Sequence, residues 1–356
     1  MQAGTKRKHN TGTLYYSKKR DRWVARFGRK TKVRRTEEEA RIQLSLMLTD
    51  GSPYADPKSD PTVREVIERW FESQHVKDLA RNSQISYRQS FATHIEPIIG
   101  DRSARNPNLQ YLVDEMTASG SSPSTVNTAS SVVRGAFHHS RLPNPAEFVK
   151  MPKIRRGEHQ IIPPDRIPEF MELCKGERLG ALFILAVTTG MRQGEMLGLY
   201  WQDIDLDKKT VKIARQLQLF DGKPEIVTVK TRKSRRMLHL SETAVTALRA
   251  HQTAMELEEF KQPTEYVFHS PRGHAIHRGN LQSPLNRLCE ALNIEPVTCH
   301  ALRHSTATYL LSLGVSPKVI QELLGHASIT TTLDLYASTT PGMHADAAAL
   351  FDGATS

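Results

Sequence analysis

The chain of 356 residues lacks long apolar runs and paired cysteines. It has no run of about 18 apolar residues that could span a bilayer, and residues 1–8 have no apolar stretch of the signal-peptide kind. The three cysteines, Cys174, Cys289 and Cys299, are scattered and odd in number, which argues against a disulfide framework. We therefore expect a protein of the reducing cytoplasm with no membrane partner. Internal repeats and low-complexity tracts are also lacking, so the length indicates two or three ordinary domains.

Acidic residues are almost lacking from the first tenth of the chain. Residues 1–35 contain 13 Lys or Arg and the single acid Asp21, which gives a net charge of +12. The whole chain carries +11, so the other residues nearly balance. A balanced protein with one concentrated basic module is expected when that module binds a phosphate backbone. Because each neutralised phosphate releases condensed counterions, we expect the affinity to fall steeply with salt.

The basic front module has the pattern of a small folded domain. Residues 13–16 and 22–27 are rich in β-branched and aromatic side chains and predict two strands, which a third could follow. Thr36 and Glu39 have capping-box spacing and predict a helix that runs to Met47. The alternative is a basic tail that binds nucleic acid loosely. The basic residues expected to contact DNA are Lys18, Lys19, Arg20, Arg22, Arg26, Arg29, Lys30, Lys32, Arg34 and Arg35.

A linker rich in turn residues, 51–61, leads to a second part with a helical pattern. Thr62 and Glu65 again have capping-box spacing and predict the start of its first helix. Further helices are predicted over about 81–97, 108–119 and 123–140. The pattern indicates an antiparallel helical bundle, whose moderate charge alone gives no strong nucleic-acid signal.

A second linker, 151–157, precedes a third part in which helices alternate with one strand-rich insert. The expected strands cover 210–213, 225–230 and 237–240, which indicates a mainly helical domain with a small antiparallel sheet. The predicted fold class of the chain is therefore mainly α with small β-sheets. Lys230 lies between two of these runs, so we expect it in or beside a hairpin turn. A basic loop at this place could also hold DNA nonspecifically.

The first candidate active-site segment is Thr189-Gly190-Met191-Arg192, where an apolar helix over 182–187 ends and the chain turns. Glu195 follows Arg192 by three residues, so both side chains can lie on one helical face. An arginine can fork onto phosphate oxygens. The alternative is a surface Arg–Glu pair near the start of a helix.

The second segment runs from His300 to His304 and includes Arg303. Spacings of three and four residues let all three side chains share a helical face. They offer a cation for phosphate and two imidazoles that can shuttle protons. Histidines four residues apart, with Cys299 adjacent, also have metal-ligand spacing, but no further cysteine pair and no Glu between the histidines supports zinc.

The third segment is a helix with both ends marked, by Ser316 before a proline and by Gly325. His326 follows its end, from where it could hydrogen-bond a phosphate. Tyr336 lies ten residues further on and offers a phenol that can attack phosphorus. Tyr309 is the alternative nucleophile, and a tyrosine at either place could instead serve only packing.

Taken in order over residues 60–340, these segments resemble the tyrosine recombinases, the family of lambda-type phage integrases and Xer proteins. The resemblance implies that Tyr336 is the nucleophile and that His300 is a general acid–base, with His304 in a structural role. It also implies that Lys230 protonates the leaving 5′ oxygen, with Lys233 as a rival for that task. The residues that would bind or support the scissile phosphate are Arg192, Glu195, Arg303 and His326.

The resemblance further implies a domain order and a set of partners. The implied domains are an arm-type DNA-binding domain at 1–55, a core-binding helical domain at 61–150, a catalytic domain at 160–340 and a tail at 341–356 that docks on a neighbouring subunit. The implied function is to integrate and excise mobile-element DNA through a 3′-phosphotyrosine link and a Holliday junction. The implied partners are double-stranded host DNA with core and arm attachment sites, a homotetramer of this chain, a host DNA-bending protein and a directionality factor. No metal or other cofactor is expected.

Two other classes of protein fit the same residues. A type IB topoisomerase-like enzyme would share the chemistry but relax supercoils without a partner site. A catalytically silent DNA-binding protein would keep the fold without using Tyr336.

Overall fold

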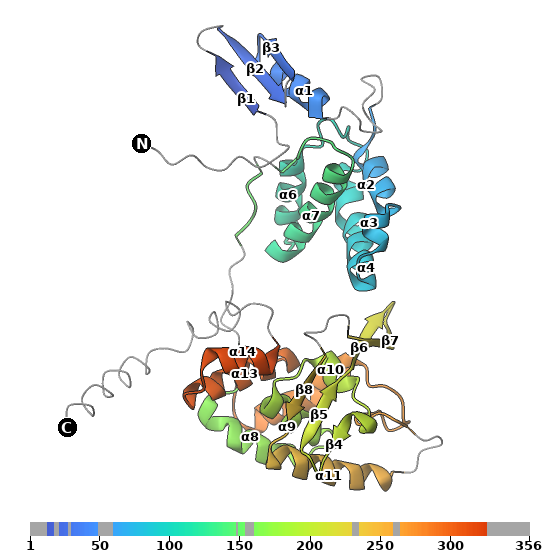
Figure 1. Cartoon of the computed structure of the whole chain (residues 1–356), viewed down its shortest axis with the longest axis vertical. Coiled ribbons are helices and arrows are strands. Elements are labelled where there is room, and N and C mark those ends of the chain that lie inside the picture. The colour runs from blue at the N-terminus through green and yellow to red at the C-terminus, as the bar shows by residue number, and fades with distance from the viewer. Residues whose placement is uncertain are drawn as a thin grey trace, which may run out of the picture. The chain divides into compact units, whose positions relative to one another are not determined.

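The computed structural model describes residues 13–17, 21–27, 30–48, 60–146, 149–153, 160–229, 235–258 and 264–325. The chain divides into two compact units, Met1–Arg156 and Gly157–Ser356 (Figure 1). This boundary lies in the segment where the second linker is predicted. The finer division of the first unit into arm-type and core-binding domains stays a prediction. None of the helices in the described ranges has the length and apolarity needed to cross a membrane.

The front of the chain forms the predicted three-stranded sheet, with one helix packed against it. The antiparallel strands, in order across the sheet, are β1 (Thr13–Ser17), β2 (Arg22–Phe27) and β3 (Lys30–Arg34), and helix α1 (Glu37–Leu48) follows. The capping box that was predicted for α1 is present: the Glu39 amide donates to Thr36 Oγ1 (3.1 Å) and the Thr36 amide donates to Glu39 Oε2 (3.3 Å). Helix α1 packs against β2, and Ala25, Ala40 and Met47 are buried there, while Val24 is buried on the opposite face of the strand.

The rest of the first unit is a helical bundle. Its helices are α2 (Val63–Phe71), α3 (Gln74–Lys77), α4 (Arg81–Ser90), the π-helix η1 (Phe91–Ile95), α5 (Glu96–Ile99), α6 (Leu109–Ala118) and α7 (Pro123–His139). The predicted capping box starts α2, because the Glu65 amide donates to Thr62 Oγ1 (3.2 Å) and the Thr62 amide donates to Glu65 Oε2 (2.9 Å). Helices α2 and α7 approach closely, since a Cβ on Gly135 would lie 2.7 Å from Cζ2 of Trp70. The helical bundle expected here is therefore present.

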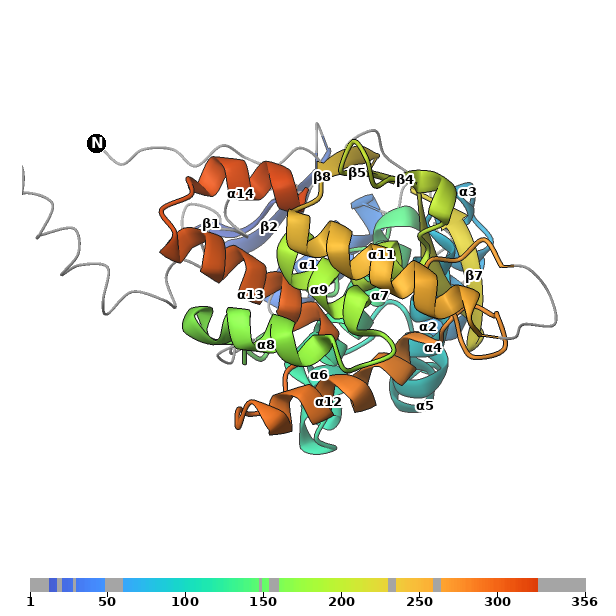
Figure 2. The same cartoon turned by 90° about the horizontal axis from the view of Figure 1, so that it is seen from below.

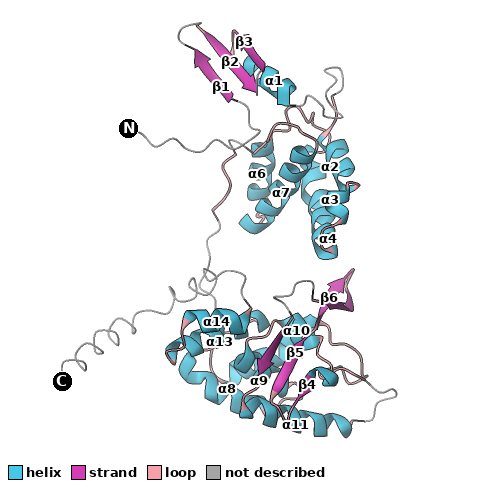
Figure 3. Ribbon diagram, in the orientation of Figure 1, coloured by secondary structure: helices cyan, strands magenta, loops and turns pink. Residues whose placement is uncertain are grey.

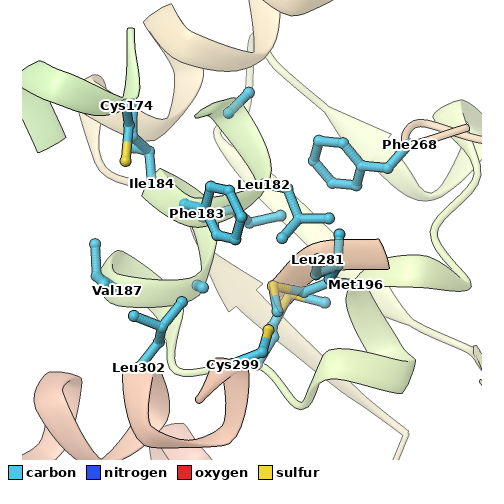
Figure 4. Close-up of a cluster of buried hydrophobic side chains, with 14 of the residues drawn as sticks. Cys174, Leu182, Phe183, Ile184, Val187, Met196, Phe268, Leu281, Cys299 and Leu302 are labelled. Carbon is cyan, nitrogen blue, oxygen red and sulfur yellow. The ribbon is translucent and has the colours of Figure 1, made fainter. Parts of the chain in front are cut away.

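The second unit is mainly helical and is built around the buried helix α9 (Gly180–Thr189). Its other helices are η2 (Pro164–Arg166), α8 (Ile167–Cys174), α10 (Gln193–Leu197), η3 (Trp201–Asp203), α11 (Glu242–Glu256), η4 (Arg278–Leu281), α12 (Gln282–Ala291), α13 (Cys299–Ser312) and α14 (Pro317–Leu324). Helices α8, α11 and α13 contact α9 from different sides (Figure 2). Phe183 of α9 packs in this core with Met196 and Leu302 (Figure 4). Because α9 is apolar on all sides, burial inside the domain is the environment it requires.

Two small antiparallel sheets accompany these helices (Figure 3). One contains β4 (Ile204–Asp205), β5 (Thr210–Ile213) and β8 (Arg236–His239), and the other is a hairpin of β6 (Arg215–Phe220) and β7 (Lys223–Thr228). The strands on either side of Lys230, β7 and β8, belong to different sheets and do not pair with each other. The expectation that Lys230 lies in or beside a hairpin turn between them is therefore wrong. The physical reason is β6, which pairs with β7 through a tight turn at Asp221 and Gly222, both with positive φ (51° and 77°).

Candidate active site

Arg192 lies at the turn between α9 and α10. Helix α9 ends at Gly190, which has a left-handed backbone (φ 61°) and where a Cβ would lie 2.2 Å from Cδ2 of Leu324. Two residues later, Arg192 takes an extended conformation as the N-cap of α10. Its Nη1 donates to Oε1 of Glu195 (3.0 Å) and its Nη2 donates to the carbonyl of Gly325 (3.1 Å), while 40% of its side chain stays exposed. The guanidinium is therefore held in place and remains accessible to a ligand.

Glu195 is the buried anion of the site, with 2% of its side chain exposed. Its carboxylate also accepts from the Arg192 amide (3.0 Å) and from both terminal nitrogens of Arg236 (3.0 and 2.9 Å). Burial by itself would raise the pKa of this carboxyl, but the hydrogen bonds and charges of Arg236 and Arg192 outweigh burial and lower the pKa. Glu195 therefore stays ionised and binds two arginines, so it does not belong to a surface pair.

Arg303 is the buried cation of the site, with 3% of the residue exposed. Helix α13 directs it to the turn after α9 and to the end of α14, where Nη1 donates to the carbonyl of Gly190 (2.6 Å) and Nη2 to that of Leu324 (2.7 Å). Burial, followed by the charges of the two neighbouring arginines, lowers the pKa of Arg303 to about 9. An incoming anion such as a phosphate would stabilise this buried charge.

The two predicted phosphate-binding arginines, Arg192 and Arg303, meet at the carboxyl end of α14. The last carbonyls of a helix carry a partial negative charge, and the guanidinium groups neutralise it. Helix α14 ends at Gly325 as predicted, and Gly325 has the left-handed conformation (φ 67°). The chain that leads on to His326 and Tyr336 thus departs from a point that both arginines hold. The predicted site residues outside the described ranges are His326, Tyr336, Lys230 and its rival Lys233.

The two histidines of α13 contact each other. The rings of His300 and His304 lie edge to face, with centroids 4.9 Å apart. His300 is exposed and His304 is half-buried, while Arg303 between them is turned into the protein. His300 therefore has the access that a proton-transfer group requires, and His304 has the partly buried place that suits a structural role.

The environments of Cys299 and Tyr309 bear on the two alternatives for this helix. Burial raises the pKa of the Cys299 thiol to about 12, which disfavours the thiolate that a metal would bind. Across the described ranges, no cluster of three His, Cys, Asp or Glu side chains is arranged to hold a metal ion. Tyr309 is half-buried and packs against the core of the domain, which favours a packing role for it.

Arg236 is a site residue that the sequence does not predict. It begins β8, and 11% of its side chain is exposed. The basic run 230–236 indicated only a catalytic lysine or a loop that holds DNA. The bond from Arg236 to Glu195 joins residues 41 positions apart, which no local spacing reveals. Its one sequence signal is its place at the start of an apolar strand.

The predicted DNA-binding residues of the front sheet lie on both of its faces. The pairing of β2 with β3 and the alternation along each strand put Lys30, Lys32 and Arg34 on one face and Arg22 and Arg26 on the other. Arg34 also donates to the side chain of Gln43 on α1, so part of its bonding capacity serves the domain itself. Arg35 is exposed just beyond β3. The predicted contacts outside the described residues are Lys18, Lys19, Arg20 and Arg29.

Comparisons with known proteins concentrate on the part of the chain that contains this site. A model of the phage integrase family matches residues 160–342, about half of the chain. The chain is 33% identical over 201 residues to a tyrosine recombinase XerC-like protein of Caldanaerobacter subterraneus subsp. tengcongensis, a match that covers 52% of this chain and 51% of that relative. It is 25% identical over 252 residues to the ICEBs1 integrase of Bacillus subtilis, which covers 68% of each chain. The chain thus spans about half the length of the first relative and two thirds of the second.

Solved structures show the same fold. The Tn1549 transposon integrase in complex with circular intermediate DNA has a TM-score of 0.69 at 20% identity, over 82% of this chain and 100% of that one. A lambda integrase tetramer bound to a Holliday junction has a TM-score of 0.58 at 17% identity, over 93% of this chain and 96% of that one. The predicted fold class, mainly α with small β-sheets, is therefore confirmed.

Proposed function

We propose that this chain, which belongs to the phage integrase family, is a site-specific tyrosine recombinase that cuts and rejoins DNA strands. The observation that carries the proposal is the convergence of Arg192, Glu195 and Arg303 at the carboxyl end of α14. Residues from segments far apart in the sequence meet at this point and form a preorganised site for a phosphate. The segment that contains Tyr336 follows directly in the chain. The names of the two relatives, XerC-like tyrosine recombinase and integrase, support the same activity.

Tyr336 would supply the nucleophile for cleavage. Its oxygen forms a bond to phosphorus while the bond from phosphorus to the 5′ oxygen breaks, which leaves a 3′-phosphotyrosine and a free 5′ hydroxyl. In this scheme His300 accepts the phenol proton and Lys230 gives a proton to the leaving 5′ oxygen. The reverse step joins the 3′ end to the 5′ hydroxyl of a partner strand. Because one phosphodiester linkage is exchanged for another, the balanced reaction consumes no nucleotide and assigns no task to a metal.

Arg192 and Arg303 would bind the nonbridging oxygens of the scissile phosphate. Their described bonds use one N–H of each terminal nitrogen, so each guanidinium keeps further N–H groups for a ligand. Two cations at this place would also favour the phenolate of Tyr336, since an unperturbed phenol has a pKa of about 10. His326 would hydrogen-bond the same phosphate.

The assembly that we propose is a homotetramer on double-stranded DNA. A lambda integrase tetramer bound to a Holliday junction shares the fold, which supports strand exchange through such a junction. In the proposed assembly, residues 61–150 bind core sites, residues 1–55 bind arm sites and residues 341–356 dock on a neighbouring subunit. A host DNA-bending protein and a directionality factor would complete the reaction on mobile-element DNA.

Covalent trapping on a nicked suicide duplex tests this function. The nick releases a short fragment with the 5′ hydroxyl, so the phosphotyrosine adduct accumulates and can be seen by denaturing electrophoresis. We expect the wild-type chain to form an adduct in the presence of chelator, Tyr336→Phe to form none, and the matched control Tyr309→Phe to retain it.

Three results would contradict parts of the proposal. An adduct that persists in Tyr336→Phe and disappears in Tyr309→Phe would reassign the nucleophile. No adduct from a chain that footprints the site would indicate a silent DNA-binding protein. Relaxation of a supercoiled plasmid that lacks recombination sites would indicate a topoisomerase-like activity.

A further inference from the structure

We propose that Arg236 is a positioning residue of the phosphoryl-transfer site, which holds Glu195 and through it orients Arg192. The proposal rests on the recombinase function proposed above and adds a residue to its machinery. Arg236 would not touch the DNA. Its task would be to fix the carboxylate to which the phosphate-binding Arg192 is attached.

The geometry of the carboxylate supports this role. Oε1 of Glu195 accepts from Nη1 of Arg192 and from Nη1 of Arg236, both at 3.0 Å. Oε2 accepts from the Arg192 amide (3.0 Å) and from Nη2 of Arg236 (2.9 Å). Each oxygen thus bridges the two arginines. Because a bidentate guanidinium fixes the plane of a carboxylate, Arg236 determines the direction in which Glu195 offers its oxygens to Arg192.

A second contact places Arg236 against the end of α14. A Cβ on Gly325 would lie 3.5 Å from Cζ and Nε of Arg236, so the guanidinium packs against this glycine. The carbonyl of the same glycine accepts from Arg192. Arg236 also begins β8, six residues after Lys230 in the chain. Arg236 therefore begins β8, binds Glu195 beside the Arg192 turn, and packs against Gly325, the residue before His326.

The charge balance of the site gives a reason for a second arginine at Glu195. With Arg192 as its single partner, the buried carboxylate would neutralise most of the charge that Arg192 offers to a phosphate. With Arg236 added, one carboxylate faces Arg192, Arg236 and Arg303, and positive charge is left over. That excess favours a bound phosphodiester and the charge that develops on it in the transition state.

The test compares single-turnover adduct formation on two duplexes, one with a normal scissile phosphate and one with a methylphosphonate. The methyl group removes the negative charge that Arg192 would bind. The variant is Arg236→Lys, which keeps the positive charge and loses the bidentate fork. The matched control is Arg178→Lys, because Arg178 makes a similar fork to Glu258 (2.7 and 2.7 Å) and its described bonds go to no predicted site residue. Thermal unfolding of each variant verifies that it is folded.

We expect Arg236→Lys to slow cleavage of the phosphate duplex on the order of 10- to 100-fold, the scale of a small misplacement of a catalytic group. The loss on the methylphosphonate duplex should be several times smaller, and Arg178→Lys should cleave both like the wild type. Adding Arg236→Lys to Glu195→Gln should slow the reaction little further, because both changes disturb Arg192 by the same route.

Different failures point to different errors. Equal losses on both duplexes, or losses of Arg236→Lys and Glu195→Gln that multiply, would assign Arg236 to the fold alone and overturn the inference. If the wild-type chain cleaves only the phosphate duplex, the two duplexes cannot be compared. The double variant of Arg236→Lys and Glu195→Gln then tests the inference, and losses that multiply overturn it. If the wild-type chain forms no adduct with either duplex, the recombinase function is wrong and the inference falls with it.

Discussion

Glu195→Gln should destabilise the second unit far more than its small change in shape suggests. The substitution removes the negative charge that holds Arg236, a side chain that is only 11% exposed. The same charge lies beside the buried Arg303. Neutralising one partner of a buried ion pair costs on the order of 3–5 kcal/mol, because the remaining charge stays buried without compensation. Since two arginines lose the same carboxylate, we expect a value in the upper half of this range.

The assay is native-state hydrogen exchange of peptides from α9 and α10, which reports the opening free energy of the region itself. The matched control is Glu258→Gln, because Glu258 pairs with Arg178 in the same domain but keeps 29% of its side chain exposed. For this more exposed pair we expect a loss of about 1 kcal/mol or less. A cost of Glu195→Gln no larger than that of the control would refute the reasoning.

The same substitution should change the pH dependence of stability. The folded protein lowers the pKa of Glu195 below its ordinary value of 4.5. Its stabilising contribution is therefore fully present above that value and is lost as the pH falls through the lower folded pKa. The stability difference between wild type and Glu195→Gln should be constant near neutral pH and shrink in acid. A difference that grows on acidification would show that the pKa is raised instead.

Three further predictions concern other parts of the chain. Gly135→Ala should destabilise the helical bundle by about 1–3 kcal/mol in urea unfolding, because the new Cβ would lie 2.7 Å from the ring of Trp70; an unchanged midpoint would contradict this close approach. Lys30→Ala combined with Lys32→Ala should reduce the slope of log affinity for arm DNA against log salt by about 2, because each neutralised phosphate contributes roughly 0.9. An unchanged slope would exclude both residues from the DNA interface. Burial raises the pKa of the Cys299 thiol to about 12, so alkylation of Cys299 at pH 8 should be much slower in folded than in unfolded protein, and equal rates would contradict its burial.

Local signals were sufficient to predict several helix ends and one pair of site residues. The capping boxes at Thr62 and Thr36 start helices where expected, because each rests on groups three residues apart. Helix α14 ends at Gly325 as predicted, since a left-handed residue there requires little from the rest of the fold. The pairing of Arg192 with Glu195 also follows from a spacing of three residues. Such features depend on neighbours in the chain and can be read from it.

Tertiary contacts explain what could not be predicted. The sequence does not predict the strand β6, although Asp221 and Gly222 form a turn typical of hairpins, and the partner of β7 is β6 rather than β8. Arg236 reaches Glu195 across a large sequence separation, so its role depends on the arrangement of β8 beside α10. The burial of Arg303 between the turn at Gly190 and the end of α14 likewise appears only in the folded protein.

Mass spectrometric mapping of the protein–DNA adduct would test the central claim most directly. The wild-type chain is trapped on the suicide duplex, digested with nuclease and protease, and searched for the peptide that carries the residual 3′ nucleotide. We predict a phosphodiester-linked nucleotide on Tyr336, in the segment that follows the end of α14 held by Arg192 and Arg303. A nucleotide on Tyr309 or on any other residue would contradict the phosphoryl-transfer site proposed for this chain.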